Sequence, residues 1–386
     1  MISKKIPQII ILGLFFVLYT IFQKSNMFYI LGTSGVLSTY SPILLFILSF
    51  AYVMFYKAPQ NNDTTFNAFL VFQVAILLVT LFYTLFYPLT YILQYFIIPL
   101  PLLCAFFVKT STLNINDESF INLSFISFLF LFIYYLQNHY IDLLMEEDAV
   151  TNASYTILYM LPLLLCSKKK SIRIVAIILT VVAVFMSIKR GSISALLAGL
   201  LIYFYIVLFK LMSNKSKLLK LIILCLACFV CYECLLYFNT LSDNSIFDRF
   251  NSIADDKGSG RLDIFKHTLE MIKNSPLLEV LFGHGWNMVI VDSKLGFSAH
   301  NDHLEILYDF GLIVYALYLV MLIRLLKLNV YLVKIKSELS APMAMSLVIF
   351  LFGSIISHIV IYPYYMTIFA VTWSYIIVSF RNKGIV

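Results

Sequence analysis

Long apolar runs without charged residues constrain this chain more than any other feature of its sequence. A helix needs about 20 consecutive apolar residues to cross the hydrocarbon of a membrane. Runs that reach or approach this length lie at 6–22, 38–56, 66–86, 88–108, 120–140, 154–166, 171–188, 192–209, 219–238, 304–327, 341–361 and 363–380. Of the 386 residues, 61% are hydrophobic and only 12% are charged, against about 25% charged in ordinary soluble domains. The sequence therefore predicts an all-α polytopic membrane protein with about 12 transmembrane helices, and it excludes a soluble globule.

The distribution of basic residues predicts the orientation of these helices. If Lys4 and Lys5 are cytoplasmic, 18 of the 27 Lys and Arg residues fall on the same side of the membrane. Short cytoplasmic loops carry such an excess in membrane proteins. We therefore expect both termini in the cytoplasm. The formal net charge of +7 is explained by topology and does not indicate a nucleic-acid partner.

Three regions follow from this topology. Residues 1–238 are predicted to hold transmembrane helices 1–9, and residues 304–386 to hold helices 10–12. Between them, residues 239–303 form a predicted extracytoplasmic loop. Within that loop, Arg261–Asn274 has apolar residues at helical spacing, which predicts an amphipathic helix on the membrane surface: Leu262, Phe265, Leu269 and Ile272.

Ionisable residues inside the predicted spans gather toward the outer ends, at His139, Glu233, Asp309 and His358. A transporter usually places its polar residues near the bilayer midplane. Asp309 would lie about two turns inside its span, where a carboxylate is costly and points to a function. This pattern favours an enzyme that acts on a lipid-linked substrate at the outer membrane boundary, with a solute carrier or flippase as the alternative.

This region contains, in order, Ser259-Gly260-Arg261, Phe282-Gly283-His284-Gly285, His300-Asn301 and Asp309-Phe310-Gly311. Together these short motifs resemble the O-antigen ligase and polymerase superfamily. The ligase-type motif is His, then Asn, Ser or Gln, nine residues, Gly, two residues, and Gly, Thr or Tyr. His300, Asn301 and Gly311 fit it, whereas Val314 departs at the last place. The other similar pieces are Ser187–Ser192 and Arg249.

The resemblance implies a GT-C-like glycosyltransferase in the bacterial cytoplasmic (inner) membrane, with its active site on the outer face. The implied donor is an oligosaccharide on undecaprenyl diphosphate, and the products are O-antigen or capsular polysaccharide. A chain-length regulator is a further partner for such an enzyme. No cofactor is implied. The sequence also has no convincing metal site, because His300, Asp302 and His303 are too close along the chain to complete one.

The chemistry of this transfer selects the predicted site residues. Negative charge grows on the departing diphosphate, and arginine can bind phosphate oxygens bidentately. Arg190 and Arg261 are the first candidates for that role, with Arg249 behind them. The structural alternatives are a topological charge for Arg190 and a solvated helix face for Arg261.

The acceptor hydroxyl needs a proton acceptor, and a neutral imidazole can serve. His300 is the candidate, with His303 as a rival and Asn301 beside it. Asp302, Glu305 or Asp309 could orient either ring. Helix capping is the structural alternative for His300, and a turn is expected around His284.

Sugar binding is predicted at His358 and Tyr364, beside Tyr362 and Tyr365, with an interfacial aromatic belt as the alternative.

Charge in the predicted loop separates two versions of the function. Residues 239–305 hold ten acidic and six basic residues, which is unfavourable for a phosphorylated lipopolysaccharide core as acceptor. The sequence therefore favours a polymerase that adds the glycan to the non-reducing end of another lipid-linked repeat unit. A ligase that transfers the glycan to lipid A–core is the first alternative.

Overall fold

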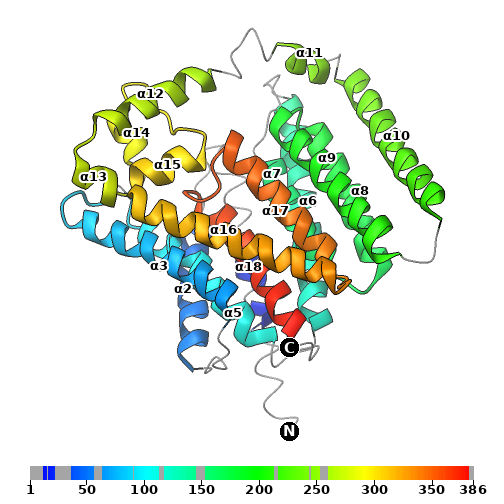
Figure 1. Cartoon of the computed structure of the whole chain (residues 1–386), viewed down its shortest axis with the longest axis horizontal. Helices are drawn as coiled ribbons and strands as arrows, with labels where there is room; N and C mark the ends of the chain where they lie inside the picture. Colours follow the sequence, from blue (N-terminus) through cyan, green and yellow to red (C-terminus); the bar gives the residue numbers. More distant parts are fainter. Residues whose placement is uncertain are drawn as a thin grey trace.

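The computed structural model describes residues 12–14, 16–21, 36–55, 63–89, 91–112, 117–144, 153–212, 216–242, 245–252 and 260–381. Within these ranges the protein is all-helical and contains no strand (Figure 1). Residues 12–14 and 16–21 are helical. The elements of the first half are α2 (Val36–Phe55), α3 (Thr64–Thr84), α4 (Gln94–Ile97), α5 (Leu100–Thr112), α6 (Asp117–Leu144), α7 (Ala153–Leu164) and α8 (Lys170–Met186). The later elements are α9 (Arg190–Tyr205), its π-helical continuation η3 (Ile206–Leu211), α10 (Lys217–Leu241), α11 (Ser245–Asn251), α12 (Arg261–Asn274), α13 (Leu277–Phe282), α14 (Met288–Asp292), α15 (Asp302–Asp309), α16 (Gly311–Lys334), α17 (Ser340–Ile356) and α18 (Pro363–Arg381).

The apolar helices confirm a polytopic membrane protein. In the described part of the chain, seven helical segments are long and apolar enough to cross a membrane. Inside hydrocarbon a helix satisfies every backbone polar group, which is why uncharged apolar runs of this length fold this way. The number of 12 spans stays a prediction. Of the first predicted span, 6–22, the structure describes only residues 12–14 and 16–21. The fourth, predicted at 88–108, corresponds to α4 and α5 and begins at Gln94.

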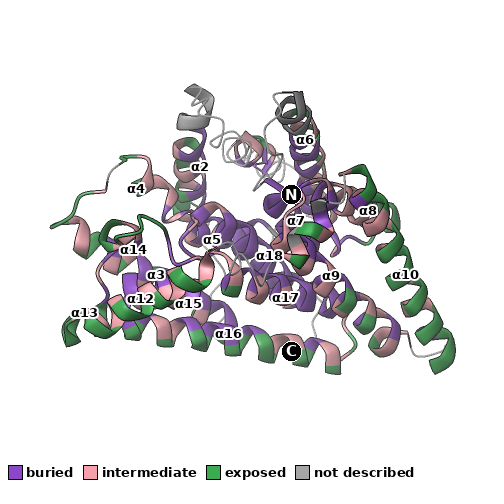
Figure 2. Ribbon diagram, turned by 90° about the horizontal axis from the view of Figure 1, so that it is seen from above, coloured by how far each residue is buried: buried purple, intermediate pink, exposed green. Residues whose placement is uncertain are grey.

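Among the seven candidate membrane spans, α18 is the most buried, and it lies among the other helices (Figure 2). It packs against α5 and α7, while α17 packs against α9 and α16 against α3. Trp373 of α18 is buried and donates from its indole Nε1 to the Ser346 hydroxyl of α17 at 3.1 Å. In contrast, α10 stands at the edge of the molecule with mostly exposed side chains (Figures 1 and 2).

Asp63 and Arg381 define one end of the bundle. Asp63 caps α3 by accepting the N–H groups of Thr65 at 2.8 Å and Phe66 at 3.1 Å. Its other carboxylate oxygen pairs with Arg381 Nε, at the end of α18, at 2.9 Å. The remaining ends of α3 and α18 lie at the opposite end of the bundle, beside Gly283 and the 357–362 segment.

The tenth predicted span, 304–327, is wrong as a single helix. The chain forms α15 up to Asp309 and begins α16 at Gly311, whose φ of 79° is left-handed. That conformation interrupts a right-handed helix and favours glycine. Asp309 therefore ends a short buried helix instead of lying two turns inside a membrane span.

The eleventh predicted span, 341–361, is too long at its end. Helix α17 stops at Ile356, and residues 357–362 connect it to α18 without helical structure. Pro363 occupies the first position of α18, where its missing N–H is tolerated, and proline disfavours helical backbone in the residue before it. His358 consequently lies in a connection instead of a membrane helix.

The predicted amphipathic helix is confirmed with its predicted bounds, as α12. It packs against α15 and buries Thr268. Leu262 and Leu269 on its apolar face remain half exposed, at 52% and 51%. The helix therefore covers part of the fold and keeps apolar side chains free for another surface.

Candidate active site

Asn301 begins α15 and fastens it to α17. Its side-chain oxygen accepts the backbone N–H groups of His303 at 2.9 Å and Leu304 at 3.2 Å, as expected of an asparagine N-cap. Its Nδ2 donates to the Ile355 carbonyl at 3.0 Å. Both the oxygen and the nitrogen of the Asn301 side chain are thus hydrogen-bonded to the backbone. The predicted contact between Asn301 and substrate would have to form in addition to these bonds.

Asp302 holds the 357–362 connection against α15. The carboxylate is completely buried and accepts the N–H groups of Ile359 at 2.9 Å and Val360 at 3.0 Å. It also accepts the Ser354 hydroxyl at 2.8 Å. Burial raises the pKa of Asp302 to about 7, although these hydrogen bonds oppose the shift. Asp302 therefore orients the segment that carries His358 through hydrogen bonds to its backbone.

The two segments bring His300 and His358 together. Their rings stack with centroids 4.8 Å apart and planes inclined by 24°. His300 adopts a left-handed φ of 49°, a backbone conformation that costs about 1–3 kcal/mol in a residue other than glycine. The hydrogen bonds of Asn301 and Asp302 to either side of the stack hold it in place. Ser298 also contacts this pair of predicted site residues. Its Oγ lies 3.0 Å from His358 Nδ1.

Arg261 and Lys189 place two positive charges near this pair. Burial, followed by the charges of Arg261 and Lys189, lowers the pKa of His300 to about 4. Burial and the neighbouring His300, Arg261 and Lys189 lower that of His358 well below its usual value. Both rings are therefore neutral at neutral pH. We call Lys189, Arg261, Ser298, His300 and His358 the histidine site.

Lys189 is a functional candidate that the sequence did not select. It precedes Arg190, the first residue of α9, and both side chains are half-buried. The Lys189 ammonium lies 5.9 Å from the ring centre of Tyr155, which also interacts electrostatically with Arg261. Sequence reasoning preferred Arg190 for its bidentate geometry. Both residues stand at the start of α9, and the charge of Lys189 acts on both histidines.

Aromatic side chains extend from the histidine pair into the bundle. His358 stacks on Tyr362 at 4.3 Å, and Tyr362 contacts Tyr364 at 5.3 Å. Tyr365 continues the series to Tyr159, with ring centres 5.2 Å apart. The predicted sugar-binding residues His358 and Tyr364 thus belong to one continuous aromatic surface.

His303 is not part of the histidine site as the structure arranges it. Its Nδ1 lies 3.2 Å from the Tyr315 hydroxyl, and its ring packs edge-on against Tyr318 at 5.5 Å. Both tyrosines belong to α16. The side chain of Arg249, another predicted residue, lies outside the described part of the structure.

Asp309 and three glycines build a separate structure, which we call the glycine crossing. A Cβ on Gly283 would lie 2.3 Å from the Asp309 carbonyl oxygen, and one on Gly311 would lie 2.4 Å from the Gly283 nitrogen. The buried Asp309 carboxylate accepts the N–H groups of Asn287 at 2.9 Å and Val289 at 3.0 Å. The Asp309 carbonyl accepts the N–H of Gly285 at 2.8 Å. Two backbones therefore meet here at a distance that only glycine permits.

His284 belongs to the same crossing and confirms the predicted turn. Its ring stacks on Tyr308 at 3.9 Å, and its Nδ1 lies 3.0 Å from the Tyr308 carbonyl oxygen. Tyr83 of α3 donates its hydroxyl to the Gly283 carbonyl. Asp309 and His284 are thus engaged in holding this turn against α3 and α15.

Residues 175–319 match a family model described as O-antigen ligase. This match supports a relation of the chain to the O-antigen ligase and polymerase superfamily. No curated protein matches the sequence. The match supports a role in glycan transfer at a membrane in general terms, because the proteins of this superfamily are glycosyltransferase-like.

The superfamily motif combines residues of the two structures. His300 lies in the histidine site, whereas Gly311 lies in the glycine crossing. Val314, which departs from the motif, is buried on α16. His358 and its tyrosines lie beyond residue 319, outside the match. The match therefore leaves out His358, the side chain that stacks on His300.

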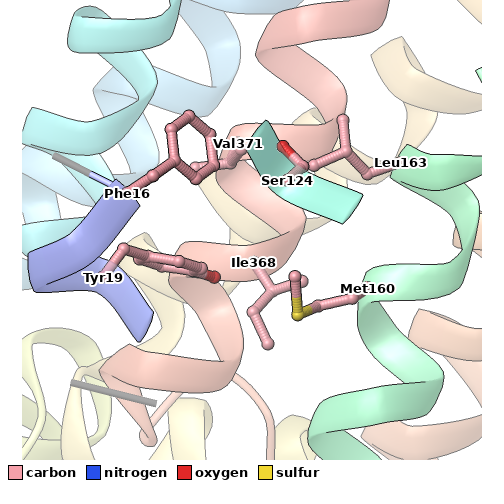
Figure 3. A pocket seen from close by; sticks show the side chains of 7 residues that line it. All are labelled: Phe16, Tyr19, Ser124, Met160, Leu163, Ile368 and Val371. Carbon is pink, nitrogen blue, oxygen red and sulfur yellow. The ribbon is translucent and has the colours of Figure 1, made fainter. Parts of the chain in front are cut away.

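A small apolar pocket elsewhere in the bundle has no ionisable side chain suited to this chemistry (Figure 3). Its lining comes from the first helical residues, α6, α7 and α18: Phe16, Tyr19, Ser124, Met160, Leu163, Ile368 and Val371. Within the described residues, no group of three His, Cys, Asp or Glu side chains could hold a metal ion. The histidine site is the better candidate for catalysis.

Proposed function

We propose that the protein is a polymerase of lipid-linked oligosaccharide repeat units. It would transfer a glycan from undecaprenyl diphosphate to the non-reducing end of another lipid-linked unit. The observation that carries this proposal is the placement of Arg261 and Lys189 beside two neutral histidines. This combination provides cations for a departing diphosphate and an imidazole for the proton of an attacking hydroxyl.

The proposed reaction is a direct displacement at the anomeric carbon. The acceptor oxygen forms a bond to this carbon while the bond to the diphosphate oxygen breaks, and the electron pair leaves on the diphosphate. Arg261 and Lys189, with Arg190 next to them, stabilise the growing negative charge. One ring of the His300–His358 stack accepts the hydroxyl proton.

Aromatic faces complete the proposed site. Tyr362 and Tyr364 continue the surface of the histidine pair and offer apolar faces against which sugar rings can pack. The site lies at the end of the bundle opposite Asp63 and Arg381. We assign this end to the outer face of the bacterial cytoplasmic membrane, with both termini in the cytoplasm.

A ligase is the second candidate, because the matching family model is described by that activity. Charge supports the polymerase. Of the ten acidic residues in 239–305, Asp302 and Glu305 are buried, which leaves eight against six basic residues. No basic excess is available to attract the phosphates of a lipid A–core acceptor.

Transfer by the protein reconstituted in liposomes tests the proposal. Lipid-linked repeat units should be converted into a ladder of longer lipid-linked glycans. Arg261→Ala and His300→Ala should each lower the rate at least about 100-fold, the loss expected for a single charge-stabilising donor or proton acceptor. Lys266→Ala, an exposed cation on the same helix, is the matched control and should keep the rate of the wild type.

Three outcomes would contradict this proposal in different ways. Transfer that persists in both Arg261→Ala and His300→Ala would place the active site elsewhere. Transfer by the wild type onto lipid A–core alone would replace the polymerase with the ligase. Movement of the lipid across the bilayer without a new glycosidic bond would indicate a flippase.

A further inference from the structure

Tyr155 of α7 places a buried hydroxyl at the start of α9. The side chain is only 5% exposed, and its ring packs against that of Tyr159 with centroids 5.7 Å apart. Its oxygen lies 2.3 Å from the position that a Cβ on Gly191 would occupy. The Tyr155 hydroxyl makes no hydrogen bond with any residue that the structure describes. Buried tyrosine hydroxyls usually find a partner, so an unpaired one points to a ligand.

Gly191 leaves the room that this hydroxyl occupies. It is the second residue of α9 and has ordinary helical backbone, so no left-handed turn requires a glycine there. A Cβ on Gly191 would also lie 2.9 Å from Ile356 Cδ1, at the end of α17. Ile356 precedes His358 by two residues. The start of α9 therefore contacts both Tyr155 and the helix that leads to His358.

The first turn of α9 offers backbone donors at the same place. The first N–H groups of a helix have no acceptor within that helix. Ile193 donates to the Lys189 carbonyl at 3.0 Å, whereas the N–H groups of Gly191 and Ser192 have no acceptor among the described residues. The Ser192 hydroxyl also donates to the Lys189 carbonyl, at 3.0 Å, and Lys189 provides no side-chain cap. Two unpaired N–H groups thus accompany the Tyr155 hydroxyl.

Positive charge accompanies these donors. Lys189 immediately precedes α9, and its ammonium lies 5.9 Å from the ring centre of Tyr155. Arg261, the second cation of the histidine site, forms no hydrogen bond or ion pair with any described residue. The N-terminus of a helix favours anions, and its N–H groups can bind phosphate oxygens. Several donors and two cations at one place suit a group with several charged oxygens.

We propose that Tyr155, Gly191 and Ser192 form a binding site for the diphosphate group of the donor lipid. The Tyr155 hydroxyl and the two backbone N–H groups donate hydrogen bonds to its oxygens, and Lys189 and Arg261 balance its charge. This inference rests on the proposed glycosyl transfer. The diphosphate gains charge as its bond to the anomeric carbon breaks, and donors already in place stabilise that charge.

Binding of inorganic pyrophosphate to the full chain in detergent tests this site. Isothermal titration calorimetry measures the dissociation constant, Kd, for the wild type and for Tyr155→Phe, which keeps the ring and removes the hydroxyl. We expect Tyr155→Phe to raise Kd at least about tenfold, because a hydrogen bond to a charged group is lost. Tyr52→Phe removes another buried tyrosine hydroxyl, from α2, and should leave Kd unchanged.

Gly191→Ala tests the position of the hydroxyl without removing it. The new Cβ would displace the Tyr155 oxygen and should also raise Kd. In the Tyr155→Phe background no oxygen remains to be displaced, and the nearest ring carbon would lie 3.5 Å from the Cβ, which is an ordinary contact. Gly191→Ala should therefore change Kd less than about twofold in that background, as expected of two residues that act through one contact.

Equal Kd values for the wild type and Tyr155→Phe would overturn the inference, as would a wild type that does not bind pyrophosphate. An equal change in Kd on Gly191→Ala in both backgrounds would also overturn it. The liposome assay keeps these failures apart from failure of the proposed function. A wild type that forms glycosidic bonds preserves the polymerase even if Tyr155→Phe binds pyrophosphate normally. A wild type that binds pyrophosphate and forms no glycosidic bond refutes the polymerase.

Discussion

The histidine site and the glycine crossing lie next to each other and share the superfamily motif, yet their polar groups are used differently. In the glycine crossing, the Asp309 carboxylate and carbonyl hold backbone N–H groups of the same turn. In the histidine site, cations, neutral imidazoles and tyrosines converge from α7, α9, α12 and the 357–362 connection. A single sequence motif thus contains residues needed for architecture as well as residues suited to chemistry.

Substitution of Gly311 should have the largest effect on folding. In Gly311→Ala the new Cβ would lie 2.4 Å from the Gly283 nitrogen, in a residue with φ of 79°. The left-handed backbone alone costs about 1–3 kcal/mol, and the contact adds to it. We expect a clear drop in melting temperature and in the monodisperse fraction on size-exclusion chromatography in detergent.

Gly296→Ala separates the cost of the left-handed backbone from the cost of the close contact between the two backbones. Gly296 has a similar φ of 65°, but a Cβ there meets nothing within 4 Å. This variant should lose only the backbone term and remain better folded than Gly311→Ala. Equal losses in the two variants would show that the close approach of the two backbones contributes nothing to stability.

Asp309→Asn should have a smaller effect, confined to stability. Burial raises the pKa of Asp309 to about 8, so the folded state binds a proton that the unfolded state releases above about pH 4. Stability should therefore fall as the pH rises from about 4 through 8, and Asp309→Asn should weaken this dependence. Thermal unfolding between pH 5 and pH 9 measures it.

The same variant, Asp309→Asn, should have little effect on the rate of glycan transfer. Because Asp309 serves the turn, folded Asp309→Asn should transfer glycan within about threefold of the wild type. A loss of transfer as large as that of Arg261→Ala, in a variant of normal melting temperature, would return Asp309 to the active site, where the sequence first placed it.

The sequence predicts the elements of this fold well where local patterns determine them. Uncharged apolar runs mark the membrane helices, and the spacing of Leu262, Phe265, Leu269 and Ile272 marks α12 with its observed bounds. The break at Gly311 was missed because the apolar pattern continues through it. Its cause is the contact with Gly283, which lies far away in the sequence.

The candidate site could be predicted only in part, because it also depends on contacts between residues that are distant in the sequence. His300 and Arg261 follow from the family motifs, but the stack of His300 on His358 depends on Asp302 binding the backbone of Ile359 and Val360. The helix-capping role of Asn301 could have been inferred, since acidic residues follow it in the first turn of α15. Nothing in the sequence around Ser298 indicates its link to His358.

The pH dependence of chemical labelling at His300 tests most directly whether cations and histidines share one site. Diethyl pyrocarbonate modifies neutral imidazole, and mass spectrometry of the peptide that contains His300 reports the extent of modification. With a pKa of about 4, His300 should label to the same extent from pH 8 down to about pH 5. In Arg261→Gln the loss of a positive neighbour should move the midpoint to higher pH, whereas Lys266→Gln should leave it in place. A midpoint near 6.5 in the wild type that Arg261→Gln does not change would contradict the account.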